Sequence, residues 1–196
     1  MSSIADGSPT GSTRIPSTGI RPARVDDATA ITRVRVDAWR HSYRGIVPDA
    51  FLDALDYSSE ARRRRRIAAP QPDQVYLVYE RDGEVAGFID GGQPAPGGQG
   101  FAAEVNALYV HPAHHRSGIG RALLVAAAEH FARRGMRSLI IWTLRRGASR
   151  KFYEAMGGKL VRERHQMFRD RPDGPAVDLD EVAYGWDDLR AIAERA

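Results

Sequence analysis

The stretch VNALYVHPAHHRSGIGR, residues 105–121, decides the fold. Its first half is a short apolar run that predicts a strand, His111-Pro112 ends the run, and an apolar helix pattern follows over residues 121–134. The first N–H groups of a helix lack partners and carry partial positive charge, so this strand–turn–helix unit can bind a phosphate. The alternative is that the glycines of the turn serve only to redirect the chain.

Gly118 and Gly120 carry no side chain that would hold a bulky anion away from the backbone. Arg116 and Arg121 flank them and can add direct contacts to a phosphate. The dinucleotide-binding fingerprint does not fit, because Leu123 stands where its third glycine belongs. The residues alone therefore predict an anion site and leave its ligand open.

Three blocks of sequence resemble one known family. LYVHP at residues 108–112, followed by HRSGIGRALL at 115–124, resembles the acetyl-CoA-binding motif of the GNAT N-acetyltransferases. SRKFYEAMGG at residues 149–158 resembles a second family segment, and residues 39–48 resemble the acceptor-side loop of one branch. The order and spacing of these blocks make the joint signal strong, and they span most of the chain from Ile20 onward.

This resemblance implies an α/β (α+β) protein with the GNAT acyltransferase fold, in which helices flank a central mixed, mainly antiparallel sheet. It also implies acetyl-CoA as co-substrate, with its pyrophosphate bound by backbone N–H groups. Two positions depart from the family pattern, since His115 replaces Gln or Arg and Arg146 replaces the common Asn. The residues expected to bind acetyl-CoA are Leu108, Tyr109, Val110, His115, Arg116, Ser117, Gly118, Ile119, Gly120, Arg121 and Ser149.

Acetyl transfer to an amine requires a base for the amine and an acid for the departing thiolate. Glu104 is the candidate base, because it lies four residues before Leu108 and residues an even number apart share a strand face. Tyr153 is the candidate acid, since a phenol with a pKa near 10 stays protonated at neutral pH and the residue falls on the family's Phe-Tyr position. A surface acid and a core tyrosine are the alternatives.

The length of 196 residues suits one domain, expected over residues 20–196 after a flexible leader at 1–19 that is rich in Ser, Gly, Thr and Pro. The chain has no cysteine, which excludes disulfides and thiolate chemistry and agrees with a cytoplasmic location. No apolar run reaches the roughly 20 residues of a membrane span, so we expect no membrane association.

The net charge is +4, and five consecutive arginines occupy residues 62–66. On a helix such a run points around the whole circumference, which predicts a solvated helix and no nucleic-acid partner. A basic patch for nucleic acid or an acidic partner is the alternative. His111, His114 and His115 lack the helix-face spacing of metal ligands, so no metal site is expected.

Hydrophobic periodicity and turn residues predict alternating helices and strands. The expected elements are helices over 28–39, 49–55 and 58–68, a hairpin of strands 75–79 and 85–89, a strand at 101–110, a helix from the glycines to Gly135, a strand at 139–144, a helix at 149–156, strands at 159–163 and 181–185, and a terminal helix at 186–195. Trp39, Tyr43 and Phe51 are expected in the apolar wall of the acceptor pocket or in the core.

The sequence therefore predicts an acetyl-CoA-dependent N-acetyltransferase that acts on a primary amine, by direct attack in a ternary complex. The acceptor class, a small molecule or a peptide, stays open, and a homodimer is compatible with the sequence. The alternatives are a non-catalytic acetyl-CoA-binding sensor or interaction module, and a nucleic-acid-binding protein that uses the arginine run.

Overall fold

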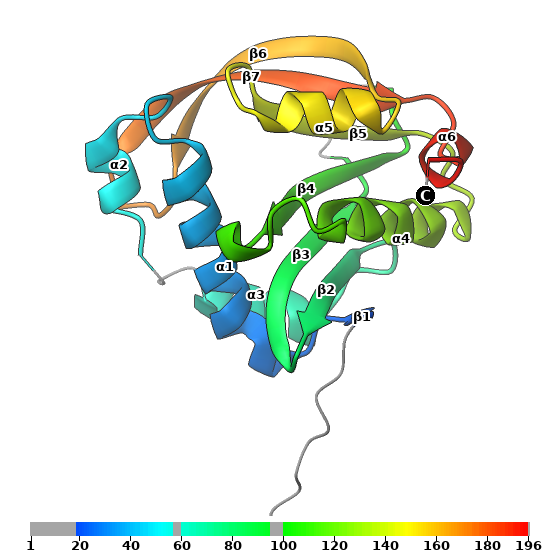
Figure 1. Ribbon diagram of the computed structural model, residues 1–196, viewed down its shortest axis with the longest axis horizontal. Helices are drawn as coiled ribbons and strands as arrows, with labels where there is room; N and C mark the ends of the chain where they lie inside the picture. The colour runs from blue at the N-terminus through cyan, green and yellow to red at the C-terminus, as the bar shows by residue number, and fades with distance from the viewer. Residues whose placement is uncertain (1–18, 57–59, 95–99, 196) are drawn as a thin grey trace, which may run out of the picture.

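The computed structural model describes residues 19–56, 60–94 and 100–195, and Figure 1 shows its arrangement. The predicted leader lies outside these residues except for Gly19, which begins the first strand. In chain order the elements are β1 (Gly19–Pro22), η1 (Val25–Asp27), α1 (Ala28–Ser42), α2 (Asp49–Asp53), α3 (Glu60–Ala68), β2 (Val75–Arg81), β3 (Glu84–Gly92), β4 (Ala103–Val110), η2 (Pro112–His114), α4 (Ile119–Ala132), β5 (Leu139–Leu144), α5 (Ser149–Ala155), β6 (Lys159–Arg169), β7 (Ala176–Trp186) and α6 (Arg190–Ala193).

One sheet of seven strands runs through the molecule in the order β1-β2-β3-β4-β5-β7-β6. The β4–β5 pair is parallel, and every other neighbouring pair is antiparallel. The expected mixed, mainly antiparallel sheet is therefore confirmed. A parallel pair needs a long crossover. Here η2 and α4 supply it, so the predicted phosphate-binding turn lies between the two central strands.

Helices cover both faces of the sheet (Figure 1). On one face, α4 packs its fully buried Leu123, Leu124 and Phe131 into the main core, where Tyr153 and Met156 from the α5 segment join it. On the other face, α1 packs against β3 and β4, with α2 and α3 beside it. Each large apolar side chain buried in this way stabilises the fold by about 1.5–3 kcal/mol. The sheet and its two helical layers fix the ends of β4 and β5.

The C-terminal third differs most from the prediction. Trp186 ends β7 and does not start a helix, because its ring is buried and its Nε1 donates to the Met156 carbonyl at 2.9 Å. The final helix begins only at Arg190. The strands β6 and β7 extend to 11 residues each and form a long hairpin. Most of β6 is exposed, which explains why its polar sequence does not resemble a buried strand.

Candidate active site

The central strands β4 and β5 separate halfway along their length. Their pairing runs from Ala103↔Leu139 to Val105↔Ile141 and stops there, although β4 continues to Val110 and β5 to Leu144. Beyond Val105 the backbone of β4 therefore faces a gap on its β5 side, while its other side stays paired with β3. A cleft of about 1010 Å³ opens at this gap, lined by β4, β5, α4, α5 and the end of α1.

A β-bulge interrupts β4 at the same point. Asp90 of β3 pairs with Ala107 and Gly91 pairs with Val105, which leaves Asn106 as the extra residue. Gly91 permits the close approach, because a Cβ at this position would lie 2.5 Å from the Glu104 carbonyl oxygen. The extra residue reverses the side-chain alternation of the strand from this point onward.

The bulge corrects the prediction that Glu104 and Leu108 share a face. Leu108 packs against the core beneath α4 and lines the cleft. Glu104 instead lines a second pocket, of about 320 Å³, which α1 and α3 also border. The even spacing is misleading because the bulge inserts one residue between the two side chains. Glu104 thus lies on the face opposite the predicted phosphate site.

The turn before α4 has the geometry of an anion site. Gly118 caps the helix in the left-handed region with φ of +82°, and Arg116 also has a positive φ of 60°. Among the described residues, no hydrogen-bond acceptor meets the N–H groups of residues 116–121. These groups sit at the N-terminus of a 14-residue helix, where the helix dipole adds positive potential. A pyrophosphate group would supply the missing acceptors.

The cleft brings together all the predicted acetyl-CoA-binding residues except Ser117. The Ser117 hydroxyl instead donates to the His114 carbonyl at 2.6 Å and so closes the turn. His115 lines the cleft, and its Nε2 lies 3.0 Å from the Val110 carbonyl oxygen, which joins the end of β4 to the turn. His115 therefore contributes to the shape of the turn, while the backbone remains available to an anion.

The α5 side of the cleft contains the second predicted block. Ser149 lies with its Oγ 2.6 Å from Thr143 Oγ1 of β5, and this contact positions the start of α5. Tyr153 lines the cleft and is only 5% exposed, and its hydroxyl makes no hydrogen bond to a described residue. Burial raises the pKa of this phenol well above its ordinary value, so it stays protonated. Phe152 also lines the cleft and packs against the main core.

The second pocket meets the cleft at the gap between β4 and β5. The two share Tyr43, Asn106, Ala107, Tyr109, Trp142 and Thr143. Tyr109 is bridged to α1, since its hydroxyl accepts from Trp39 Nε1 at 2.8 Å. Trp39 and Tyr43 line this second pocket, and Phe51 is buried in the core, with its ring centroid 6.1 Å from that of Trp39. The cleft and the second pocket are therefore adjacent at this gap.

The arginine run is not a uniformly solvated helix face. Arg63 is buried, with its Nε 3.1 Å from Thr32 Oγ1, and Arg66 forms an ion pair with the buried Asp90 at 3.2 Å. Together with Arg62 they line the second pocket. Arg62, Arg65 and Arg66 are exposed, and Arg64 is half-buried and paired with Glu60 four residues earlier. The expected solvated helix therefore holds for the run except at Arg63. Packing of α3 onto α1 turns Arg63 inward.

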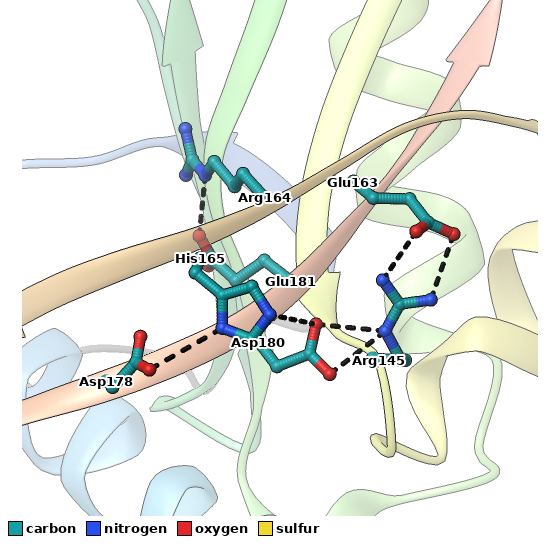
Figure 2. A network of polar contacts seen from close by, with 7 residues as sticks. All are labelled: Arg145, Glu163, Arg164, His165, Asp178, Asp180 and Glu181. Atoms are coloured by element: carbon teal, nitrogen blue, oxygen red, sulfur yellow. Dashed lines mark hydrogen bonds and ion pairs between the residues drawn. The ribbon is translucent and has the colours of Figure 1, made fainter.

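Ion pairs connect the β6–β7 hairpin to the end of β5, next to the cleft (Figure 2). Arg145, which follows β5, bonds to Asp180 at 2.9 Å and to Glu163 at 2.7 Å. Arg164 bonds to Glu181 at 2.7 Å and stacks 3.9 Å over the Trp142 ring. These contacts hold the end of β5 and the loop after it against the hairpin, and Trp142 and Ala148 of this segment line the cleft. The sequence carried no signal for them, because the hairpin itself was predicted too short.

Neither a metal-binding cluster nor a membrane-spanning helix is found in the described parts of the chain. Those parts contain no group of three or more His, Cys, Asp or Glu residues that could hold a metal ion. None of their helices is long and apolar enough to cross a membrane. The cleft, its unpaired N–H groups and the left-handed Gly118 instead fit the pyrophosphate and the extended chain of acetyl-CoA.

Comparison with known proteins agrees with this geometry. The Acetyltransferase (GNAT) family matches residues 36–158. The N-acetyltransferase YuaI of Bacillus subtilis is 32% identical over 174 residues, which cover 88% of this chain and 95% of YuaI. The mycothiol acetyltransferase of Amycolatopsis mediterranei is 33% identical over 125 residues, 62% of this chain and 38% of that protein.

Solved structures show the same fold. The PaiA N-acetyltransferase of Thermoplasma acidophilum in complex with coenzyme A aligns with a TM-score of 0.67 at 22% identity, covering 87% of this chain and 99% of that one. The yncA protein of Salmonella typhimurium with acetyl-CoA aligns with a TM-score of 0.62 at 24% identity, covering 87% and 92%. The chain therefore belongs to the GNAT family, as an N-acetyltransferase with acetyl-CoA as its co-substrate.

Proposed function

We propose that the protein transfers the acetyl group of acetyl-CoA directly to a primary amine while both substrates are bound. The observation that carries this proposal is that the cleft and the second pocket adjoin. The cleft with the anion-binding turn and the pocket with Glu104 meet where β4 and β5 separate. A thioester held from one side and an amine held from the other would come together at this gap, and proximity of this kind contributes much of the rate acceleration in group transfer.

Glu104 is proposed as the base for the amine. An alkylammonium group with a pKa near 10.4 must lose a proton before it attacks, which costs about 4–5 kcal/mol at pH 7. Glu104 lies in the smaller pocket, on the face away from the phosphate turn, so it is on the side from which the amine would enter. We propose that its carboxylate accepts the ammonium proton directly or through a bound water.

Tyr153 is proposed as the acid for the leaving sulfur. Its ring is buried, its hydroxyl has no partner among the described residues, and burial keeps the phenol protonated by raising its pKa. The new C–N bond forms as the C–S bond breaks, and the Tyr153 hydroxyl would donate its hydrogen bond or proton to the thiolate. Backbone N–H groups of residues 108–110, beyond the pairing with β5, are proposed to stabilise the carbonyl oxygen as it gains charge.

Two measurements test this proposal in sequence. Acetyl-CoA should raise the melting temperature in a saturable way, because a ligand that binds only the folded state stabilises it. Release of free thiol over a panel of primary amines should then identify acceptors. Protection by acetyl-CoA without turnover of any amine would contradict the catalytic proposal. No protection at millimolar acetyl-CoA would contradict the placement of acetyl-CoA in the cleft.

A further inference from the structure

The pocket that contains Glu104 is unusually rich in arginine. Five arginines line it, from α1, α3 and β6, and the carboxylates that line it belong to β3, β4 and β7. The arginines are Arg35, Arg62, Arg63, Arg66 and Arg164, and the carboxylates are Asp90, Glu104 and Glu181. Asp170, which lies outside the lining, adds a fourth carboxylate by pairing with Arg35 at 2.6 Å. The pocket thus carries more positive than negative charge.

The pairing of these charges shows where the excess lies. Arg66 pairs with Asp90, and Arg164 pairs with Glu181. Arg63 is only 7% exposed, yet within the described residues no carboxylate pairs with it, and its bonds go to the neutral hydroxyls of Thr32 and Tyr76. The buried Asp90 carboxylate acts electrostatically on Arg63, but it is already paired with Arg66. A buried guanidinium that has to share its counter-charge is incompletely compensated, which is costly. A bound anion would relieve that cost.

Arg35 provides an independent indication of an anion. Its side chain is 7% exposed and lies 5.2 Å over the Trp39 ring. Its Nη2 contacts Asp170 as an ion pair outside hydrogen-bond geometry, and its Nη1 is buried with no partner among the described residues. Buried donors of this kind are normally satisfied in a folded protein. An oxyanion is the acceptor that a guanidinium binds best.

We propose that the amine acceptor is a small zwitterion, such as an amino acid or an aminophosphonate, whose oxyanion group is bound by Arg35 and Arg63. This inference rests on the proposed function, because it assigns the pocket to the acceptor. Glu104 comes from the sheet, whereas Arg35 and Arg63 come from the helices that cover it, so the pocket offers an anion to the ammonium group and cations to the oxyanion. A volume of about 320 Å³ suits one small molecule.

The test compares acceptors that differ only in the anion. Amino acids, their carboxamides and the matching aminophosphonates are assayed for kcat/KM by thiol release. We expect the acids or the phosphonates to exceed the amides at least about tenfold, since a hydrogen bond to a charged group contributes roughly this much or more. The acceptor series with the higher kcat/KM, amino acids or aminophosphonates, identifies whether the bound oxyanion is a carboxylate or a phosphonate. Amides or polyamines that react as well as the acids would overturn the inference while acetyl transfer itself stands.

Variants locate the anion site. Arg63→Met should lower kcat/KM for the anionic acceptors about 10- to 100-fold and leave the amides within about twofold. Because Arg63 is buried, its replacement can also destabilise the fold. Arg62 is exposed and lines the same pocket, so Arg62→Gln provides a second variant, and it should reduce the preference for anionic acceptors over amides by a smaller factor. Arg65→Gln is the matched control, since Arg65 is exposed on the same helix and does not line the pocket. An equal loss for acids and amides in both pocket variants would refute the assignment.

Absence of acetylation of any amine would contradict the proposed function, but the anion site can still be tested by binding. Isothermal titration of the same acids and amides onto the protein saturated with CoA then replaces the kinetic comparison. Binding of the acids or phosphonates with weak or absent binding of the amides would support the anion site. Equal binding of all of them, or of none, would overturn it.

Discussion

Substitution of Gly120 by alanine should stabilise the free protein and weaken its binding of acetyl-CoA. Gly120 is the second residue of α4 and does not have a positive φ. An added Cβ would lie 3.7 Å from Val110 Cγ2 and 3.8 Å from Phe152 Cζ, which are ordinary contacts. Alanine therefore fits the free structure and lowers the entropy of the unfolded chain. The expected gain is about 0.5 kcal/mol, or about 1–2 °C in melting temperature.

The same methyl group would project into the cleft between Val110 and Phe152, where Gly120 contributes to the lining. It would hold the pyrophosphate away from the first N–H groups of α4. Loss of a partly buried contact of this kind costs about 1–2 kcal/mol. The dissociation constant for CoA should then rise about 5- to 30-fold. Thermal unfolding without ligand measures the first effect, and calorimetric titration with CoA measures the second.

Gly118→Ala is the matched comparison two residues earlier. Its Cβ would meet nothing within 4 Å, but φ is +82°, so alanine would be strained by about 1–2 kcal/mol. This variant should melt below the wild type, while Gly120→Ala should melt above it. A Gly120→Ala protein that melts lower without ligand, or that binds CoA like the wild type, would refute the reasoning.

Three further predictions concern single side chains. Glu104→Gln should lower kcat about 100-fold with unchanged CoA affinity by titration, because Glu104 lines only the smaller pocket. Tyr153→Phe should lower kcat by a similar factor and leave the melting temperature within about 2 °C; full activity would exclude it as the acid. Burial, with Arg134 and Arg133, lowers the pKa of His130 below 6.5. The unfolded chain then binds the extra proton first, so denaturant titrations should show stability falling as pH drops below about 6.5, and less so in His130→Gln.

Local patterns were sufficient to predict the strand–turn–helix unit. The apolar run, the two glycines and the apolar face of α4 each specify local geometry, and the structure places them as predicted. The face of Glu104 could not be predicted, because the bulge at Asn106 depends on pairing with β3, a separate segment. The one local hint is Gly91, and a glycine in a strand does not reveal which strand bulges.

The burial of Arg63 in the arginine run could not be predicted from local sequence either. Five like charges in sequence favour exposure, and no local rule turns Arg63 into the interior. Its burial depends on Thr32 of α1 and on Tyr76 of β2, which lie far away in sequence and supply oxygen atoms for the guanidinium. The long β6–β7 hairpin escaped prediction for a related reason, since β6 is an exposed edge strand without apolar alternation.

The cleft and the second pocket are lined by helices on opposite faces of the sheet, and this has a kinetic consequence. Helices α4 and α5 line the cleft, α1 and α3 line the pocket, and the two share lining residues at the gap between β4 and β5. If the amine binds in the pocket as proposed, neither substrate has to pass the other on its way in, and initial-rate kinetics should then show a random order of addition. In that proposed arrangement the acetylated product would also leave through the pocket while CoA remains bound, so slow release of CoA would be compatible with rapid exchange of acceptor.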